Sequence, residues 1–152
     1  MLHQEWWICC QIGAREHYAI PRSLHLTHQL KVCFTDIWVP PNSPLRWLPQ
    51  VCQSGLSDRF HSDLQQAPIR DFTYSALVFE AKQRLHSNPP WTTMMARNRW
   101  FQAQVIQRLE RLRVDQQEKL ILFSYSYAAL ELFRYARCFS SPRILAAVVS
   151  RV

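Results

Sequence analysis

The chain has 152 residues, which suits one domain of ordinary size and is short for two. Hydrophobic residues make up 48% of it and charged residues 19%, a composition that argues against intrinsic disorder. Only two glycines are present, Gly13 and Gly55, so the chain can hold neither a G-x-G-x-x-G loop nor a P-loop, whose backbones need several glycines to approach phosphate. A self-contained nucleotide-binding enzyme is therefore not expected.

The charge is strongly basic, with 18 Lys and Arg against 11 Asp and Glu and a net charge of +7. The bases are dispersed and no two are adjacent, and the tryptophans stand mostly in apolar segments, so the sequence does not favour nucleic acid as a partner. The same basic charge favours an anionic membrane surface as the partner. No uncharged stretch approaches the ~20 residues of a membrane-spanning helix, and the N-terminus lacks the basic region of a secretory signal. Five cysteines without a C-x-x-C pair favour a reduced, cytoplasmic protein, with peripheral membrane contact as an option.

The first 39 residues predict a βαβ unit. Trp6–Ile12 is a nearly continuous apolar run of the kind that forms a strand buried on both faces. Gly13 ends it, and Ala14–Leu26 is expected to be helical, with Pro21 marking either a kink or the first turn. A second buried strand is expected over Leu30–Val39. This order predicts a parallel sheet with right-handed crossovers.

The rest of the chain continues the alternation of helices and strands. Pro40–Pro49 holds four prolines and predicts an irregular surface loop, and Asn88–Pro90 predicts a firm break between helices. The other expected elements are short helices at Leu56–Leu64 and Thr73–His86, the longest helix at Trp91–Arg113, a strand at Leu120–Ser124, a helix at Tyr127–Arg137 capped by Ser126, and a fourth strand at Ile144–Val149. The predicted fold class is α/β, an open, mostly parallel Rossmann-like sheet flanked by helices.

The segment between the first strand and the first helix is the strongest candidate for a ligand site. In α/β proteins ligands bind at the carboxyl ends of the strands, and a helix N-terminus there favours anions. The candidate residues in this segment are Gly13, Ala14, Arg15, Glu16 and His17, and the end of the third strand adds Ser124, Tyr125 and Ser126 at the same sheet edge. A purely structural interpretation stays open, in which Glu16 suits a helix N-terminus while Arg15 and His17 face water.

A second candidate surface lies on the predicted long helix. Arg97, Arg108 and Arg111 fall on one stripe beside Trp100, next to an apolar face. Such a stripe suits anionic lipid headgroups, with each base adding about 1 kcal/mol near the surface. A non-enzymatic module that binds a membrane surface or a protein partner is therefore the alternative to an enzyme.

No catalytic, metal or cofactor site is predicted. His25 and His28 have a spacing that could place two imidazoles on one helix face, but no Cys or carboxylate nearby completes a zinc site, which needs four ligands. The chain has no G-x-S-x-G elbow for a serine hydrolase. Cys9 and Cys10 lie in an apolar run, where a thiol is buried rather than activated.

Three phrases in order resemble one family. Gly13–His25 (GAREHYAIPRSLH), Arg97–Gln102 (RNRWFQ) and Phe123–Ala136 (FSYSYAALELFRYA) look like the N-terminal domain of bacterial two-domain glycosyltransferases of the GT-B type, the retaining group 1. In that family a Gly-Gly-x-Glu-like loop follows the first strand, and the second strand ends in Thr-Asp. Gly13, Glu16 and Lys31–Asp36 occupy those places here, and Ala14 replaces the second glycine.

The resemblance implies an incomplete enzyme. Residues 1–137 correspond to the acceptor-side Rossmann-like half, and 138–152 form a divergent C-terminal tail. The family's C-terminal domain, which binds the nucleotide-sugar and carries a Glu-seven-Glu pair, has no counterpart; Glu110 and Glu118 have that spacing but lie in the wrong half. The expectation is a truncated glycosyltransferase-like protein, inactive alone, whose partner would be the missing domain. A stand-alone α/β fold with only architectural likeness remains an alternative.

Overall fold

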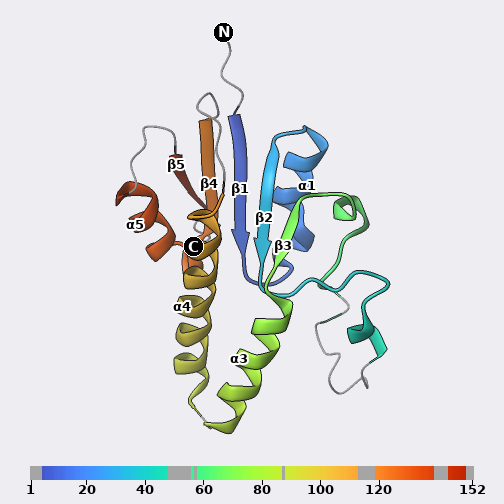
Figure 1. The fold of residues 1–152 in the computed structure, drawn as a ribbon, viewed down its shortest axis with the longest axis vertical. Coiled ribbons are helices and arrows are strands. Elements are labelled where there is room, and N and C mark those ends of the chain that lie inside the picture. The colour runs from blue at the N-terminus through green and yellow to red at the C-terminus, as the bar shows by residue number, and fades with distance from the viewer. Residues whose placement is uncertain are drawn as a thin grey trace.

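The computed structural model of the chain describes residues 5–47, 56, 58–86, 88–112, 119–138 and 144–149. Its centre is a five-stranded sheet in which every pair of neighbouring strands is parallel (Figure 1). The strands are β1 (Glu5–Gln11), β2 (Leu30–Thr35), β3 (Ile69–Asp71), β4 (Lys119–Tyr125) and β5 (Ile144–Val149), in the order β3-β2-β1-β4-β5. The helices are α1 (Ala19–Leu26), α3 (Thr73–Leu85), α4 (Pro90–Leu109) and α5 (Leu130–Cys138). The predicted open α/β, Rossmann-like class is confirmed.

The first strand of the chain occupies the middle of the sheet. Cys10 in β1 lies opposite Phe34 in β2 on one side and opposite Ser124 in β4 on the other. The order reverses at β1, since the chain moves outward to β2 and β3 and then crosses back to β4 and β5. In open α/β sheets the ligand crevice lies at such a reversal, outside the carboxyl ends of the strands.

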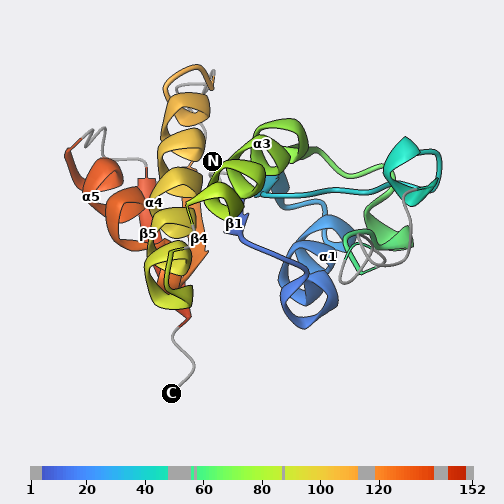
Figure 2. The ribbon, with the colours of Figure 1, turned by 90° about the horizontal axis from the view of Figure 1, so that it is seen from below.

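The sheet is covered on both faces because its side chains alternate. One face carries Ile8, Cys10 and Leu122, which pack with Phe101 and Val105 of α4. The other face carries Cys9, Cys33 and Phe123, which pack with Tyr18, Leu64 and the α1 side chains Ile20 and Leu24. Figure 2, which looks along the strands, shows α3 and α4 on one side of the sheet and α1 on the other. Burial on both faces explains why the strands are apolar throughout.

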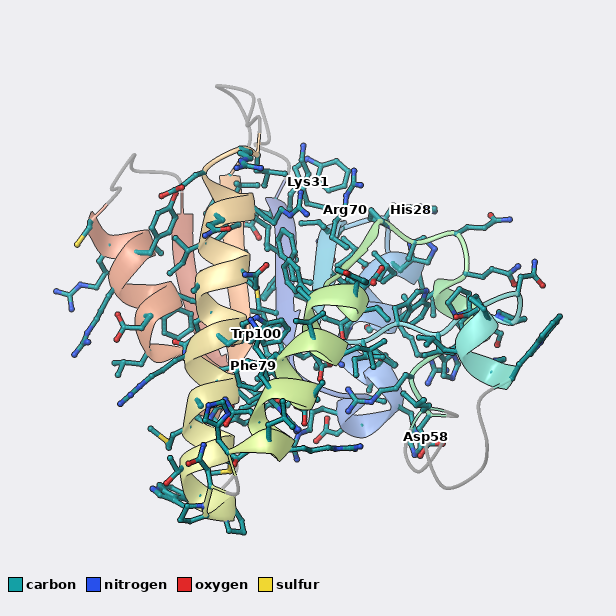
Figure 3. The ribbon with its side chains drawn as sticks, turned by 60° about the horizontal axis from the view of Figure 1, so that its bottom comes forward. His28, Lys31, Asp58, Arg70, Phe79 and Trp100 are labelled. Atoms are coloured by element: carbon teal, nitrogen blue, oxygen red, sulfur yellow. The ribbon has the colours of Figure 1, made fainter. Side chains whose placement is uncertain are left out.

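Helices α3 and α4 form a hairpin that extends beyond the carboxyl ends of the strands (Figure 1). The two helices contact each other through Phe79 and Trp100, whose rings are stacked with centroids 5.2 Å apart (Figure 3). Beside this stack, Arg97 Nε donates a hydrogen bond of 2.7 Å to Glu80 Oε1. Phe72, just before α3, packs edge-on against Phe101 and joins the hairpin to the core.

Several predicted boundaries are wrong. The expected helix at Leu56–Leu64 reduces, among its described residues, to one 3-10 turn, η3 (Ser62–Leu64), and β2 ends at Thr35 instead of Val39. The first helix begins at Ala19 instead of Ala14, which places Pro21 in its first turn. Ser126 does not cap a helix: it starts the 3-10 turn η4 (Ser126–Ala128), and α5 follows from Leu130.

Candidate functional site

The loop after β1 is fixed by a buried carboxylate. Gly13 has a φ of +80°, a conformation that glycine adopts without strain. Its backbone N–H donates a hydrogen bond of 2.8 Å to Asp36 Oδ1, and Arg59 Nη1 binds the same oxygen at 2.7 Å. Asp36 is only 3% exposed, so this charge is held inside the protein by an ion pair and a backbone donor. A methyl group on Gly13 would approach Arg59 Nη1 to 3.3 Å.

The chain then makes a left-handed turn where the sequence predicts the start of a right-handed helix. Glu16, His17 and Tyr18 have φ values of 50°, 51° and 60° within and at the end of η1 (Arg15–Tyr18). The turn ends in the core, because Tyr18 is fully buried and packs edge-on against Trp38 at 5.3 Å. The N-terminus of α1 is therefore at Tyr18 and Ala19. The prediction that Gly13–His17 form the N-terminus of the first helix is therefore wrong.

A pocket of about 460 Å³, open to solvent, lies at this edge of the sheet. The loop contributes all five candidate residues predicted from the sequence, Gly13 to His17. The remaining lining residues come from three other places, and they are Ile12, Asp58, Arg59 and Arg97. The pocket therefore joins the end of β1, the segment before η3 and the α3–α4 hairpin.

Side-chain charge dominates the lining. Arg15, Arg59 and Arg97 reach the pocket from three separate segments. Arg59 is held by Asp36 and Arg97 by Glu80, so both guanidinium groups are oriented by carboxylates behind them. Guanidinium groups bind phosphate and carboxylate in defined geometry. These side chains can thus bind an anion even though the left-handed turn leaves no helix N-terminus at Gly13–His17.

The pocket also contains two carboxylates, Glu16 and Asp58, both on exposed residues. Carboxylate oxygens accept hydrogen bonds from ligand hydroxyl groups. Behind the loop, Gln11 Nε2 donates to the Gly13 carbonyl at 2.8 Å, while the buried Gln11 Oε1 has no hydrogen-bond partner among the described residues. The site therefore offers both donors and acceptors to a polar ligand.

The end of β4 flanks the pocket but does not line it. Ser124 is buried and its hydroxyl donates to the Tyr125 carbonyl at 3.3 Å, whereas Ser126 is exposed. The connection to the pocket runs through Tyr127: its ring is 4.8 Å from the Arg15 guanidinium and is stacked on Tyr125 at 6.1 Å. Tyr127 Oη also donates to the Ile12 carbonyl at 3.1 Å.

Burial sets the ionisation of the aromatic and thiol groups near the site. Burial raises the pKa of Tyr125 to about 12, and the neighbouring Glu16 carboxylate contributes to the same shift. Burial also raises the pKa of Tyr127, although Arg15 opposes it. The pKa of the Cys33 thiol rises to about 12 through burial. These groups are neutral near pH 7, so they are poor bases and nucleophiles there.

The predicted membrane stripe is divided by the structure. Arg97 turns to Glu80 and the pocket, and Trp100 packs against Phe79. Arg108 and Arg111 are exposed near the opposite end of α4, and Arg111 lies beyond the helix, which ends at Leu109. Two of the four residues thus contact α3, and the other two are exposed.

No group of three or more His, Cys, Asp or Glu side chains suited to a metal ion occurs in the described part of the chain. α1 ends at Leu26, so His25 and His28 do not share a helix: His28 has a φ of 57° in the turn that follows. Glu110 is exposed, and Glu118 lies outside the described residues. Among the described helices, none is both long and apolar enough to cross a membrane.

The sequence analysis did not identify five residues that line or support the site: Ile12, Asp36, Asp58, Arg59 and Tyr127. Asp36 stands directly after β2 as the structure has it, but inside the strand predicted over Leu30–Val39, so the apolar pattern did not place it at the carboxyl edge. Comparison of the chain with models of protein families, with curated proteins and with solved structures finds no match. The functional argument therefore rests on the geometry of the pocket.

Proposed function

We propose that this chain acts as the acceptor-side half of a nucleotide-sugar-dependent glycosyl transferase and does not transfer sugar by itself. The observation that carries the proposal is the pocket of about 460 Å³ at the carboxyl edge of the sheet, lined by Gly13–His17, Arg59 and Arg97. This is the edge at which open α/β sheets bind their ligands. The same residues include part of the phrases that resemble the glycosyltransferase family.

The chemistry of the pocket suits an acceptor that carries hydroxyl groups and an anionic group. Glu16 and Asp58 can accept hydrogen bonds from sugar hydroxyls, and Arg15 can bind a phosphate or carboxylate. No glycine-rich loop is available for the diphosphate of a nucleotide-sugar. Transfer would require a second domain to bring the donor to this pocket, because such catalysis depends on positioning and on stabilising the leaving diphosphate.

The test is a titration of the purified, isotope-labelled chain followed by amide NMR, with glucose 6-phosphate as the acceptor-like probe and UDP-glucose as the donor probe. Glucose 6-phosphate should shift the amide signals of Gly13–His17, and Arg15→Gln should weaken its binding roughly tenfold by removing one charge-assisted contact. UDP-glucose should bind no more tightly than glucose 6-phosphate and should not be hydrolysed or transferred.

Arg134→Gln is the matched control, because Arg134 is exposed on α5 and pairs with Glu131 at 2.7 Å, away from the pocket residues. It should leave the binding of glucose 6-phosphate unchanged. Two results would contradict the proposal: sugar transfer from UDP-glucose by the chain alone, or signal shifts that avoid the pocket loop altogether.

A further inference from the structure

Helix α3 presents an apolar stripe to solvent. Tyr74 is 83% exposed, Val78 39% and Leu85 83%, and Ala81 between them is also exposed. These positions are spaced by three or four residues and therefore lie on one face of the helix. A surface helix of a globular protein normally turns such a stripe toward the core.

The core of α3 is on its other side. Ala76 is buried, Phe79 stacks on Trp100, and Glu80 binds Arg97, so these positions face α4 and the sheet. They lie about half a helical turn from Tyr74 and Leu85. The apolar stripe is thus additional to the core-facing side.

The exposed charges around the C-terminal part of the stripe are basic, whereas Asp71, which accepts a hydrogen bond from Thr73 N–H, is exposed before its N-terminal end. Lys82 and Arg84 are exposed and stand on either side of Leu85 and Ala81 along the helix surface. Glu80, the one acidic residue of α3, is turned away and paired with Arg97. From Thr73 to Leu109 the sequence has five basic residues and that single acid: Lys82, Arg84, Arg97, Arg99 and Arg108.

The end of the hairpin adds two exposed apolar side chains. Trp91 is 68% exposed and Met94 41% at the start of α4, at the same end of the hairpin as Leu85. The hairpin extends beyond the sheet (Figure 1), so a flat surface can reach this end without contacting the strands. Exposed Trp and Leu beside bases are typical of helices that lie in the interface of an anionic bilayer.

We propose that the α3 face, defined as Tyr74, Val78, Leu85, Lys82 and Arg84, binds the surface of a membrane containing anionic phospholipid. The apolar side chains enter the headgroup region, and the two bases contact lipid phosphates. The occupant is lipid because the exposed bases Lys82 and Arg84 flank the highly exposed Leu85, at the end of the hairpin that also exposes Trp91. This surface is independent of the pocket and differs from the stripe predicted on α4.

The experiment measures partitioning of the intact chain onto vesicles by co-sedimentation. Vesicles of equal parts phosphatidylcholine and phosphatidylglycerol should bind the protein, and binding should fall with added salt. The double variant Lys82→Gln with Arg84→Gln should lower the partition coefficient about 25-fold, about fivefold for each base. Leu85→Ser should lower it roughly tenfold through the lost apolar contact.

Two matched variants keep the test specific. Arg108→Gln with Arg111→Gln removes the same charge from the far end of α4, and Leu130→Ser removes a leucine that is 59% exposed on α5. Both should bind vesicles as the parent chain does. All four variants change exposed side chains, and circular dichroism of each should match that of the parent chain.

Three outcomes would overturn the proposal. The first is equal binding to vesicles of phosphatidylcholine alone, which would remove the role of charge. The second is loss of binding in the Arg108 and Arg111 variant but not in the Lys82 and Arg84 variant. The third is failure of the parent chain to bind anionic vesicles while light scattering shows a dimer that Leu85→Ser dissociates, which would assign the α3 face to a second copy.

Discussion

The turn from Arg15 to Tyr18 places backbone strain beside the pocket. A left-handed residue other than glycine costs roughly 1–2 kcal/mol, so Glu16, His17 and Tyr18 together cost on the order of 3–6 kcal/mol. Burial of the Tyr18 ring against Trp38 offsets part of this cost. Strain that persists beside a polar pocket is a feature of ligand sites, where it presents side chains that a regular helix would direct elsewhere.

His17→Gly should therefore stabilise the protein. The side chain is exposed and φ is 51°, so glycine removes the left-handed penalty, while the greater freedom of the unfolded chain cancels part of the gain. The expected increase in the free energy of unfolding is about 0.5–1 kcal/mol, measured by urea denaturation.

Ser23→Gly, at an exposed position inside α1, is the control for that measurement, and it should destabilise by a similar amount. If both substitutions lower the free energy of unfolding, the left-handed conformation of His17 is not a source of strain.

Some pocket residues could be predicted from the neighbouring sequence and others could not. Gly13 to His17 could be placed from the sequence, because a lone glycine between an apolar strand and a helical segment marks the carboxyl edge of the sheet. Arg59 could not, since it is 23 residues from Asp36 and meets it only in the folded chain. The left-handed turn also had no local signal, as Glu16 and His17 are ordinary helix residues by propensity.

At the scale of elements, α5 begins on a cap supplied by another helix. Gln102 of α4 is buried, and its Oε1 accepts a hydrogen bond of 2.7 Å from the backbone N–H of Glu131. Its Nε2 donates to the Asn98 carbonyl at 3.0 Å, which fixes the amide orientation. A free donor of the first turn of α5 is thereby satisfied from α4.

Gln102→Leu should destabilise the protein by about 1–3 kcal/mol, because the partly buried N–H of Glu131 in the first turn of α5 loses its acceptor. Thermal unfolding gives the measurement. The control is Gln107→Leu, the same change at an exposed position of the same helix, which should alter stability by less than about 0.5 kcal/mol. Equal effects of the two changes would show that the contact with Glu131 contributes nothing.

The elements that the sequence predicts well are those with a long apolar pattern. β1, β4, α3 and α4 appear within a few residues of their expected bounds. β3 was missed because it has three residues, Ile69–Asp71, and exists through its pairing with β2. The expected helix at Leu56–Leu64 is wrong because Arg59 is held by Asp36 and its carbonyl accepts from Val39 N–H, contacts that hold the segment against the end of β2.

At the scale of the whole molecule, the buried thiols and phenols make the free energy of unfolding fall at alkaline pH. Burial holds the pKa of Cys33 and Tyr125 at about 12, against ordinary values of 9.0 and 10.0, and it raises the pKa of Tyr18, Cys9 and Cys10 as well. As the pH rises, the unfolded chain releases these protons at a lower pH than the folded chain does. Stability is therefore fully present below about pH 9 and is lost as the pH rises toward 12.

Urea denaturation as a function of pH checks this dependence. The free energy of unfolding should change little between about pH 7 and 8.5 and then fall, each group contributing up to about 1.4 kcal/mol per pH unit. Cys33→Ala should reduce the slope above pH 9, whatever its effect on stability at neutral pH. An unchanged slope in that variant would mean that Cys33 does not contribute.

The central place of β1 has a consequence for how the protein is made. Its first residue, Glu5, is 114 positions from its partner Lys119 in β4. At a synthesis rate of about 5–20 residues per second, roughly 6 to 23 seconds separate the emergence of these two strands from the ribosome. During that interval β2 can cover only one edge of β1, and the other edge presents unpaired backbone groups and apolar side chains. The nascent chain thus carries the future centre of its sheet as an open edge until β4 is made.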